Sequence, residues 1–233
     1  MTPEQFAESL KKSCGENLVS VVLYGSAAAG DAVQGKSSYN TMLVLKECGL
    51  DALKAATAAS KEWLKKDNPA PLIFTKEQLL SSGDSFPIEL ADMKDFNKTL
   101  YGEDLLPGIT IKAADLRLAV EREFKGKLLL LRRSYLLSGG DKKILAALMA
   151  DSISEVLVLC RAALRLHTAS VPNAKLDCVT ELRKHADFDD AIFAEIHGFR
   201  ASGGKGAGDT EPLFDRYLKA AGQLCAAVDT WTK

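Results

Sequence analysis

Apolar residues in the first half of the chain follow two different spacings. The run Leu18–Tyr24 (LVSVVLY) is apolar and rich in valine, and it ends at Gly25, which predicts a buried strand. Other stretches repeat their apolar residues every three or four positions, as an amphipathic helix does. The pattern predicts strands at 18–24, 41–45, 72–74 and 87–93, and helices at 2–12 and 51–66.

Past Pro107-Gly108 the spacing becomes helical throughout. One stripe at three- and four-residue intervals is closed by Ser138-Gly139-Gly140, and Asp141 is placed to cap the helix that follows. The stripe consists of Leu116, Val120, Phe124, Leu128, Leu131 and Tyr135. The pattern predicts helices at about 116–138, 141–167, 174–186, 188–201 and 210–231.

The change of spacing predicts an α+β protein with two domains. Residues 1–108 are expected to form a mixed sheet with flanking helices, and residues 109–233 an antiparallel helical bundle. A strand inside 115–200 would contradict this division.

Composition limits the classes of partner. The formal net charge is −1, whereas proteins that grip bulk nucleic acid carry a basic surplus, so that class is not expected. No apolar run approaches the roughly 20 residues that cross a bilayer, so no membrane partner is expected. The five cysteines are scattered without a CxxC spacing, which predicts reduced thiols and a cytoplasmic protein.

A loop rich in small residues follows the first predicted strand. It reads Leu23-Tyr24-Gly25-Ser26-Ala27-Ala28-Ala29-Gly30-Asp31. This loop resembles the GS loop of the nucleotidyltransferase superfamily, the fold of kanamycin nucleotidyltransferase and of minimal bacterial nucleotidyltransferases. The resemblance implies that Gly25 and Ser26, with Lys36 nearby, bind the phosphates of a nucleoside triphosphate. A chain without Cβ bulk and with free donors suits a dense anion.

The resemblance continues through Gly35–Leu45 (GKSSYNTMLVL). There the family has Asp-x-Asp before a strand, and the two carboxylates hold paired Mg²⁺ ions. In this chain the two positions fall on Ser38 and Asn40, and a register one residue later gives Tyr39 and Thr41, so the pair is missing in both registers. We therefore do not expect the Mg²⁺ site of the family to be retained.

A third acid of the family sits on a later strand. The stretch 86–94 (FPIELADMK), followed by Leu100–Asp104 (LYGED), resembles that region and places Glu89 at the acid. The resemblance implies a catalytic base or a relic of a metal ligand. The alternative is an outward residue on an edge strand. Convergence of Asp31, Glu89 and Asp92 would restore a carboxylate site.

Two other patterns compete with this interpretation. Gly30-x-x-x-x-Gly35-Lys36-Ser37 satisfies the P-loop pattern, although five residues separate Gly30 from the strand and no helix is expected after Ser37. Arg161 and His167 loosely fit the Arg-x4–6-His motif of HEPN ribonucleases, for which a charged helix end is the simpler account. His185 and His197 are predicted to be ordinary helix-surface residues.

The sequence thus leaves two classes of function. The first is a catalytically impaired member of the fold, a pseudoenzyme, that binds a nucleotide or a partner protein through the old cleft. The second is an active transferase that moves a nucleoside monophosphate to a small molecule or a protein. The apolar runs at 128–131 and 156–159, and the pairing of kanamycin nucleotidyltransferase-like subunits, also predict a homodimer.

Overall fold

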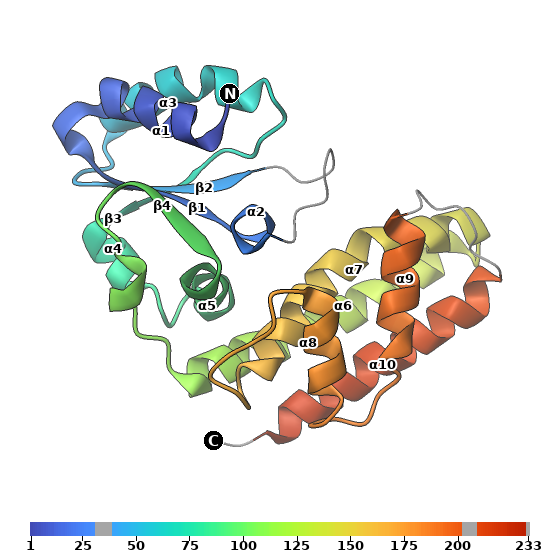
Figure 1. Ribbon diagram of the computed structural model, residues 1–233. Coiled ribbons are helices and arrows are strands. Elements are labelled where there is room, and N and C mark those ends of the chain that lie inside the picture. The colour runs from blue at the N-terminus through green and yellow to red at the C-terminus, as the bar shows by residue number, and fades with distance from the viewer. Residues whose placement is uncertain (31–38, 202–208, 232–233) are drawn as a thin grey trace. The chain divides into compact units, whose positions relative to one another are not determined.

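The computed structural model describes residues 1–30, 39–201 and 209–231, and these residues form two compact units. Unit 1 comprises Met1–Lys112 and unit 2 comprises Ala113–Lys233. Unit 1 contains a mixed sheet with helices on both faces, whereas the described part of unit 2 is helical (Figure 1). This is the α+β architecture that the change of spacing predicts, and no strand occurs in the stretch 115–200, all of which is described.

The sheet of unit 1 has the strand order β3-β2-β1-β4. Strand β1 (Leu18–Tyr24) lies at the centre and pairs antiparallel with β2 (Asn40–Leu45) and with β4 (Asn97–Gly102). Strand β3 (Leu72–Thr75) runs parallel to β2. The register sets Tyr24 opposite both Asn40 and Asn97. The end of β1 and the starts of its two neighbours therefore meet at one end of the strands, and we call this end the polar edge of the sheet.

Helices α1 (Pro3–Cys14) and α3 (Leu50–Leu64) cover one face of the sheet (Figure 1). Thr2 and Gln5 form a capping box that starts α1 in front of Pro3. Phe6 of α1 stacks on Trp63 of α3 with ring centroids 4.4 Å apart, and both side chains are fully buried. Together with Val21, Leu43 and Leu45 they make an apolar core on this face.

The short helices α4 (Lys76–Ser81) and α5 (Pro87–Asp95) cover the other face. Their buried residues Leu79, Leu90 and Met93 join a second core with Val22, Met42 and Val44 of the strands. Lys94 donates a 2.6 Å hydrogen bond to the backbone oxygen of Ile109, which holds the end of α5 against the last segment of unit 1.

The strand predicted at 87–93 is wrong, because this segment is helix α5. Pro87 occupies the first turn, where its missing N–H is no loss, and the backbone N–H of Leu90 bonds to the oxygen of Phe86. Ile88 and Leu90 suggest alternation, but Ala91 and Met93 are buried too, which a strand with one exposed face does not allow. The strand of this region is instead β4.

Unit 2 is a bundle of five helices in the described residues. They are α6 (Ala113–Ser138), α7 (Lys142–Leu164), α8 (Lys175–Leu182), α9 (Ala191–Ala201) and α10 (Thr210–Thr230). Helix α7 contacts each of the other four. Within the described ranges, no helix combines the length and the apolar character that crossing a bilayer requires.

Candidate functional site

The site begins where β1 ends. Gly25 follows Tyr24 with φ 81° and ψ −150°, a conformation that L side chains rarely adopt. Its N–H donates to the oxygen of Phe96 at 3.1 Å, which fixes the turn next to the start of β4. Ser26 then opens the four-residue helix α2 (Ser26–Ala29). The small residues that suggested a GS loop therefore form a sharp turn at the strand end.

Asn40 is the residue of the degenerate pair that the structure describes. It is the first residue of β2, it lies opposite Tyr24, and it is half-buried. A Cβ atom added to Gly25 would lie 3.4 Å from Asn40 Nδ2, so the amide sits directly beside the glycine turn. Ser38 and Lys36, the other two residues expected here, lie outside the described residues.

The alternation of the strands decides on which face this amide lies. Val22, Met42 and Val44 belong to the core under α5, and Tyr24 packs against that core. Asn40 precedes Met42 by two residues, so it lies on the same face of the sheet as Tyr24. The polar edge of the sheet is therefore on the face that α4 and α5 cover.

Glu89 reaches this neighbourhood from α5. The expectation that it sits on a strand is wrong, because Pro87–Asp95 is helical. Glu89 is exposed, and its negative charge acts on Tyr24: burial is the main cause that raises the pKa of the Tyr24 phenol, and the charge of Glu89 adds to it. Glu89 thus lies on the sheet face where Tyr24 and Asn40 are found, although the element that carries it differs.

The described acids do not form a cage for a metal ion. Within residues 1–30, 39–201 and 209–231, no three side chains of His, Cys, Asp or Glu are grouped closely enough to hold one. Glu89 and Asp92 are three residues apart on α5 and share a side of that helix. Asp31, the third acid considered, lies outside the described residues, so the convergence that would restore a carboxylate site can be followed only for these two.

The P-loop pattern does not fit the local structure. In a P-loop the lysine and the residue after it open a helix. Here β1 is followed by the short helix α2, and the chain enters strand β2 at Asn40, three residues after Ser37. Within the described residues, the pattern is therefore followed by a strand and not by the helix of a P-loop.

Arg161 and His167 are packed inside unit 2. The guanidinium of Arg161 is 1% exposed and donates to the oxygen of Asn173 at 3.3 Å. The ring of His167 stacks on His185 with centroids 4.2 Å apart, and Trp231 meets it edge-on at 4.3 Å. No sequence pattern predicts this stack. These contacts favour a structural role over the ribonuclease alternative.

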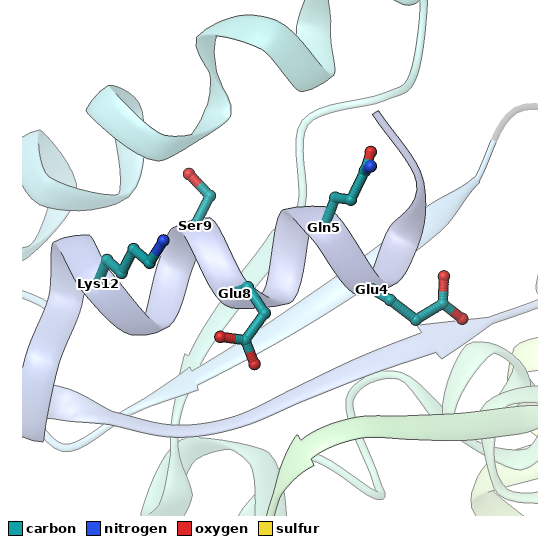
Figure 2. Close-up of a pocket in the computed structure, with 5 residues that line it drawn as sticks. All are labelled: Glu4, Gln5, Glu8, Ser9 and Lys12. Atoms are coloured by element: carbon teal, nitrogen blue, oxygen red, sulfur yellow. The ribbon is translucent and has the colours of Figure 1, made fainter.

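A hollow of about 440 Å³ lies along α1, lined by Glu4, Gln5, Glu8, Ser9 and Lys12 (Figure 2). All five residues belong to one helix, and two already serve the fold. Gln5 closes the capping box with Thr2, and Glu4 pairs with Lys98 of β4 at 2.9 Å, a hydrogen bond that lowers the pKa of Glu4. The hollow is a helix surface remote in sequence from the Gly25 turn, and we assign no chemistry to it.

The chain has the fold of a nucleotidyltransferase. A solved structure of spectinomycin adenyltransferase AAD(9) from Enterococcus faecialis, with ATP and spectinomycin, matches 97% of this chain and 97% of its own with a TM-score of 0.60. The sequence identity is 14%, so the likeness establishes the fold alone. No protein-family model matches the sequence, and no curated protein matches it.

Proposed function

We propose that the protein binds a nucleotide at the Gly25 turn and has lost most of the metal-dependent transfer activity of its fold. One observation carries the proposal. Asn40 stands beside Gly25 at the start of β2, where the resemblance places a metal-binding carboxylate. Ser38, the other position of the pair, also lacks a carboxylate.

The electrostatic consequence is large. Mg²⁺ prefers carboxylate oxygens, and an amide oxygen or a hydroxyl neutralises none of its charge. In phosphoryl transfer the metal ions offset the charge that develops on the phosphate oxygens. Glu89 alone supplies one negative charge, and it does so from a helix, so a site with two metals would lack its bridging ligands.

Nucleotide binding needs less than catalysis does. The backbone turn at Gly25, the hydroxyl of Ser26 and the ammonium of Lys36 would serve the phosphates. The similar adenyltransferase was solved with ATP, which supports a nucleoside triphosphate as the ligand class. Its second ligand, spectinomycin, belongs to that protein, and we propose no antibiotic substrate for this chain.

The alternative is an active transferase that moves a nucleoside monophosphate to a small molecule or a protein. Glu89 favours it, because this exposed carboxylate lies close enough to Tyr24 to raise the pKa of the phenol at the site edge. In that case Glu89 is the base or the remaining metal ligand.

Calorimetric titration of the full chain with ATP, GTP, CTP and UTP, each with and without Mg²⁺, tests the proposal. We expect binding of at least one nucleotide, with an affinity that Mg²⁺ changes less than about tenfold, or about 1.4 kcal/mol. Ser26→Ala should weaken nucleotide binding. Ser81→Ala at the end of α4 is the matched control and should leave nucleotide binding unchanged.

Two results would overturn the proposal. The first is the absence of heat with every nucleotide. The second is a strict requirement for Mg²⁺ together with release of pyrophosphate in the presence of an acceptor mixture, and this would establish the active alternative.

We also propose a homodimer, and the structure limits which apolar residues could form the contact between its subunits. Val156, Leu157 and Leu159 are buried by the neighbours of α7, so this run needs no second copy. The outer side of α6 keeps exposed leucines, and Leu118 and Leu129 are 60% and 64% exposed. A mass of about 25 kDa by light scattering at micromolar concentration would exclude the dimer.

A cytoplasmic location remains a proposal as well. All five cysteines are free thiols, which agrees with a reducing compartment. Fractionation of cells that produce the full chain would test it.

A further inference from the structure

The turn between α6 and α7 carries an exposed apolar end. Leu136 and Leu137, in the last turn of α6, are 80% and 78% exposed, more than any other large apolar side chain among the described residues. Ile144, in the first turn of α7, is 52% exposed. We call residues 132–144 the hairpin end. Three large apolar side chains at one turn cost free energy in water, so they indicate a contact.

The same hairpin end is positively charged. It carries four exposed cations: Arg132, Arg133, Lys142 and Lys143. Within 132–144 the only acid is Asp141, whose carboxylate caps α7 by accepting from the N–H groups of Lys143 and Ile144. Glu211 at the start of α10 also lies at this end, where it accepts a 2.7 Å hydrogen bond from the Tyr135 hydroxyl. Lys142 lies 3.4 Å from Asp209, and both side chains of this pair are more than half exposed. The other three cations form no ion pair within the described part of the chain.

We propose that the hairpin end docks on an anionic lipid surface. Stable attachment to a bilayer takes two signals, an apolar group that enters the interface and a basic cluster that meets anionic headgroups. The leucines supply the first signal and the two basic pairs supply the second. The ligand class is therefore a membrane surface rich in phosphatidylglycerol or phosphatidylserine.

Charge complementarity favours this occupant over a second copy of the chain. A twofold contact places the same patch of both copies face to face. Leu136 against its own copy would then bring Arg132 and Arg133 near their copies, where like charges repel. An anionic surface removes this conflict, because each cation meets a negative headgroup.

The shape of the hairpin end agrees with a lipid surface. Helix α6 has 26 residues and is about 39 Å long, so the turn lies far from where the helix enters unit 2. Figure 1 shows the α6–α7 turn at one end of the bundle, where α10 also begins. An exposed apolar turn at the end of a bundle can meet a flat, deformable surface, whereas helix-binding proteins offer grooves.

The proposal departs from the expectation that the protein has no membrane partner. That expectation rested on the absence of a segment able to cross a bilayer, and docking through a helical turn needs none. The inference is independent of the proposed nucleotide site, since the residues it uses belong to unit 2, whereas that site lies in unit 1.

Co-sedimentation of the full chain with phosphatidylcholine vesicles, with and without 30 mol% phosphatidylglycerol or phosphatidylserine, tests the proposal. We expect binding to both kinds of anionic vesicle at about 50 mM salt and at least fivefold weaker binding at about 300 mM salt, because salt screens headgroup attraction. Leu136→Gln with Leu137→Gln should lower binding tenfold or more. Arg132→Gln with Arg133→Gln should lower it on anionic vesicles in particular.

The control variants make the same kinds of substitution at exposed positions outside the hairpin end. Leu50→Gln removes a leucine that is 69% exposed on α3, and Arg183→Gln with Lys184→Gln removes a basic pair that already has acid partners. Both controls should bind vesicles as the natural protein does. Circular dichroism of each variant verifies folding, and the exposed positions chosen make loss of the fold an unexpected result.

Three results would overturn the proposal. One is the absence of binding to either anionic vesicle. Another is equal loss in the Leu50 control and in the Leu136 and Leu137 variant. The last is a natural protein that is dimeric by light scattering and becomes monomeric in the Leu136 and Leu137 variant, which would make the hairpin end a contact between copies.

Discussion

The two faces of the sheet in unit 1 differ in what closes them. The face under α1 and α3 is sealed by the stack of Phe6 on Trp63, and its core is apolar. The face under α4 and α5 has an apolar core as well, but at its edge stand Tyr24 and Asn40, with the carboxylate of Glu89 acting on Tyr24. The longer helices cover the first face, and the second receives helices of six and nine residues.

We expect this difference to separate the residues that stabilise the sheet from those that bind the proposed ligand. Side chains that alternate along β1 and β2 send every second residue to each face. The first face has the larger aromatic stack, Phe6 on Trp63, whereas the second has the half-buried Tyr24 and Asn40 at its edge. Substitutions on the first face should therefore lower the free energy of unfolding, and substitutions at the polar edge of the second face should change ligand affinity.

The largest expected effect comes from Trp63→Ala. Trp63 is fully buried, stacks on Phe6 and donates to the oxygen of Pro69 at 2.9 Å, so truncation leaves a cavity and an unmatched acceptor. We expect a loss of about 3–5 kcal/mol in the free energy of unfolding, measured by urea titration. Leu53→Ala on α3, where the side chain is 40% exposed, is the control and should cost less than about 1 kcal/mol. Nucleotide affinity of the folded fraction should stay unchanged, and a parallel loss of affinity would abolish the distinction between the faces.

A smaller effect is expected from Gly25→Ala. The backbone of Gly25 (φ 81°, ψ −150°) lies in a region that essentially only glycine adopts, so an alanine there costs about 1–3 kcal/mol. The strain falls on the turn that would hold the phosphates, so nucleotide affinity should drop together with stability. Gly49→Ala, at a glycine with open space and no positive φ, is the matched control. Nucleotide binding as strong as in the natural protein would place the ligand elsewhere.

A third prediction concerns the two positions at the polar edge where the resemblance places carboxylates. Ser38→Asp with Asn40→Asp should raise Mg²⁺ affinity about tenfold, or about 1.4 kcal/mol, since two carboxylates would join Glu89. Asn173→Asp in unit 2 makes the same chemical change outside the motif and should leave Mg²⁺ affinity as it is. Adding Glu89→Gln to the double variant should remove the gain. Titration calorimetry with MgCl₂ measures all four proteins, and an unchanged affinity of the double variant would separate Glu89 from any former metal site.

The smallest effect concerns the titration of Tyr24. Burial first and Glu89 second raise the pKa of this phenol above its ordinary value, so the neutral form is favoured in the folded state. The contribution of the neutral Tyr24 phenol to the free energy of unfolding is complete below the pKa of this phenol in the unfolded chain, near 10. It is lost as the pH rises through the pKa of the phenol in the folded state. Glu89→Gln should therefore lower the pKa of Tyr24 slightly, seen by ultraviolet titration with Tyr24→Phe as the reference. A pKa that does not move would show that Glu89 is too far from the phenol to take part in the site.

Most elements were predictable because their apolar spacing is regular. Leu18–Tyr24, Thr41–Leu45 and the long helices of unit 2 follow one period from end to end. The error at 87–93 arose where two rules disagree. Ile88 and Leu90 alternate as in a strand, whereas Pro87 favours the first turn of a helix, and burial of Ala91 and Met93 on α5 decides the matter.

Strand β4 shows the opposite difficulty. Asn97–Gly102 (NKTLYG) has an exposed lysine and half-buried neighbours at the edge of the sheet, so its sequence has no strong period. Only the pairing with β1 makes it a strand. Gly102 is needed there, because a Cβ atom would lie 1.9 Å from the oxygen of Val19, a contact that no local pattern reveals.

The site could be anticipated where the residues belong to one motif. Gly25 and Asn40 are 15 residues apart, and the antiparallel pairing of β1 with β2 brings them together as the resemblance implied. The influence of Glu89 on Tyr24 depends on how α5 packs under the sheet, which a single sequence does not state. The His167–His185–Trp231 stack is likewise a product of tertiary packing.

Because α7 is central in unit 2, the helices that cover it are completed only late in synthesis. This helix is nearly enclosed by α6, which precedes it, and by α8, α9 and α10, which follow it. A ribosome adds about 5–20 residues per second, so the apolar sides of α7 wait several seconds for Thr210–Thr230 to emerge. During that interval Met149, Val156 and Leu157 have no complete cover, so α7 of the nascent chain is exposed to chaperones or to self-association.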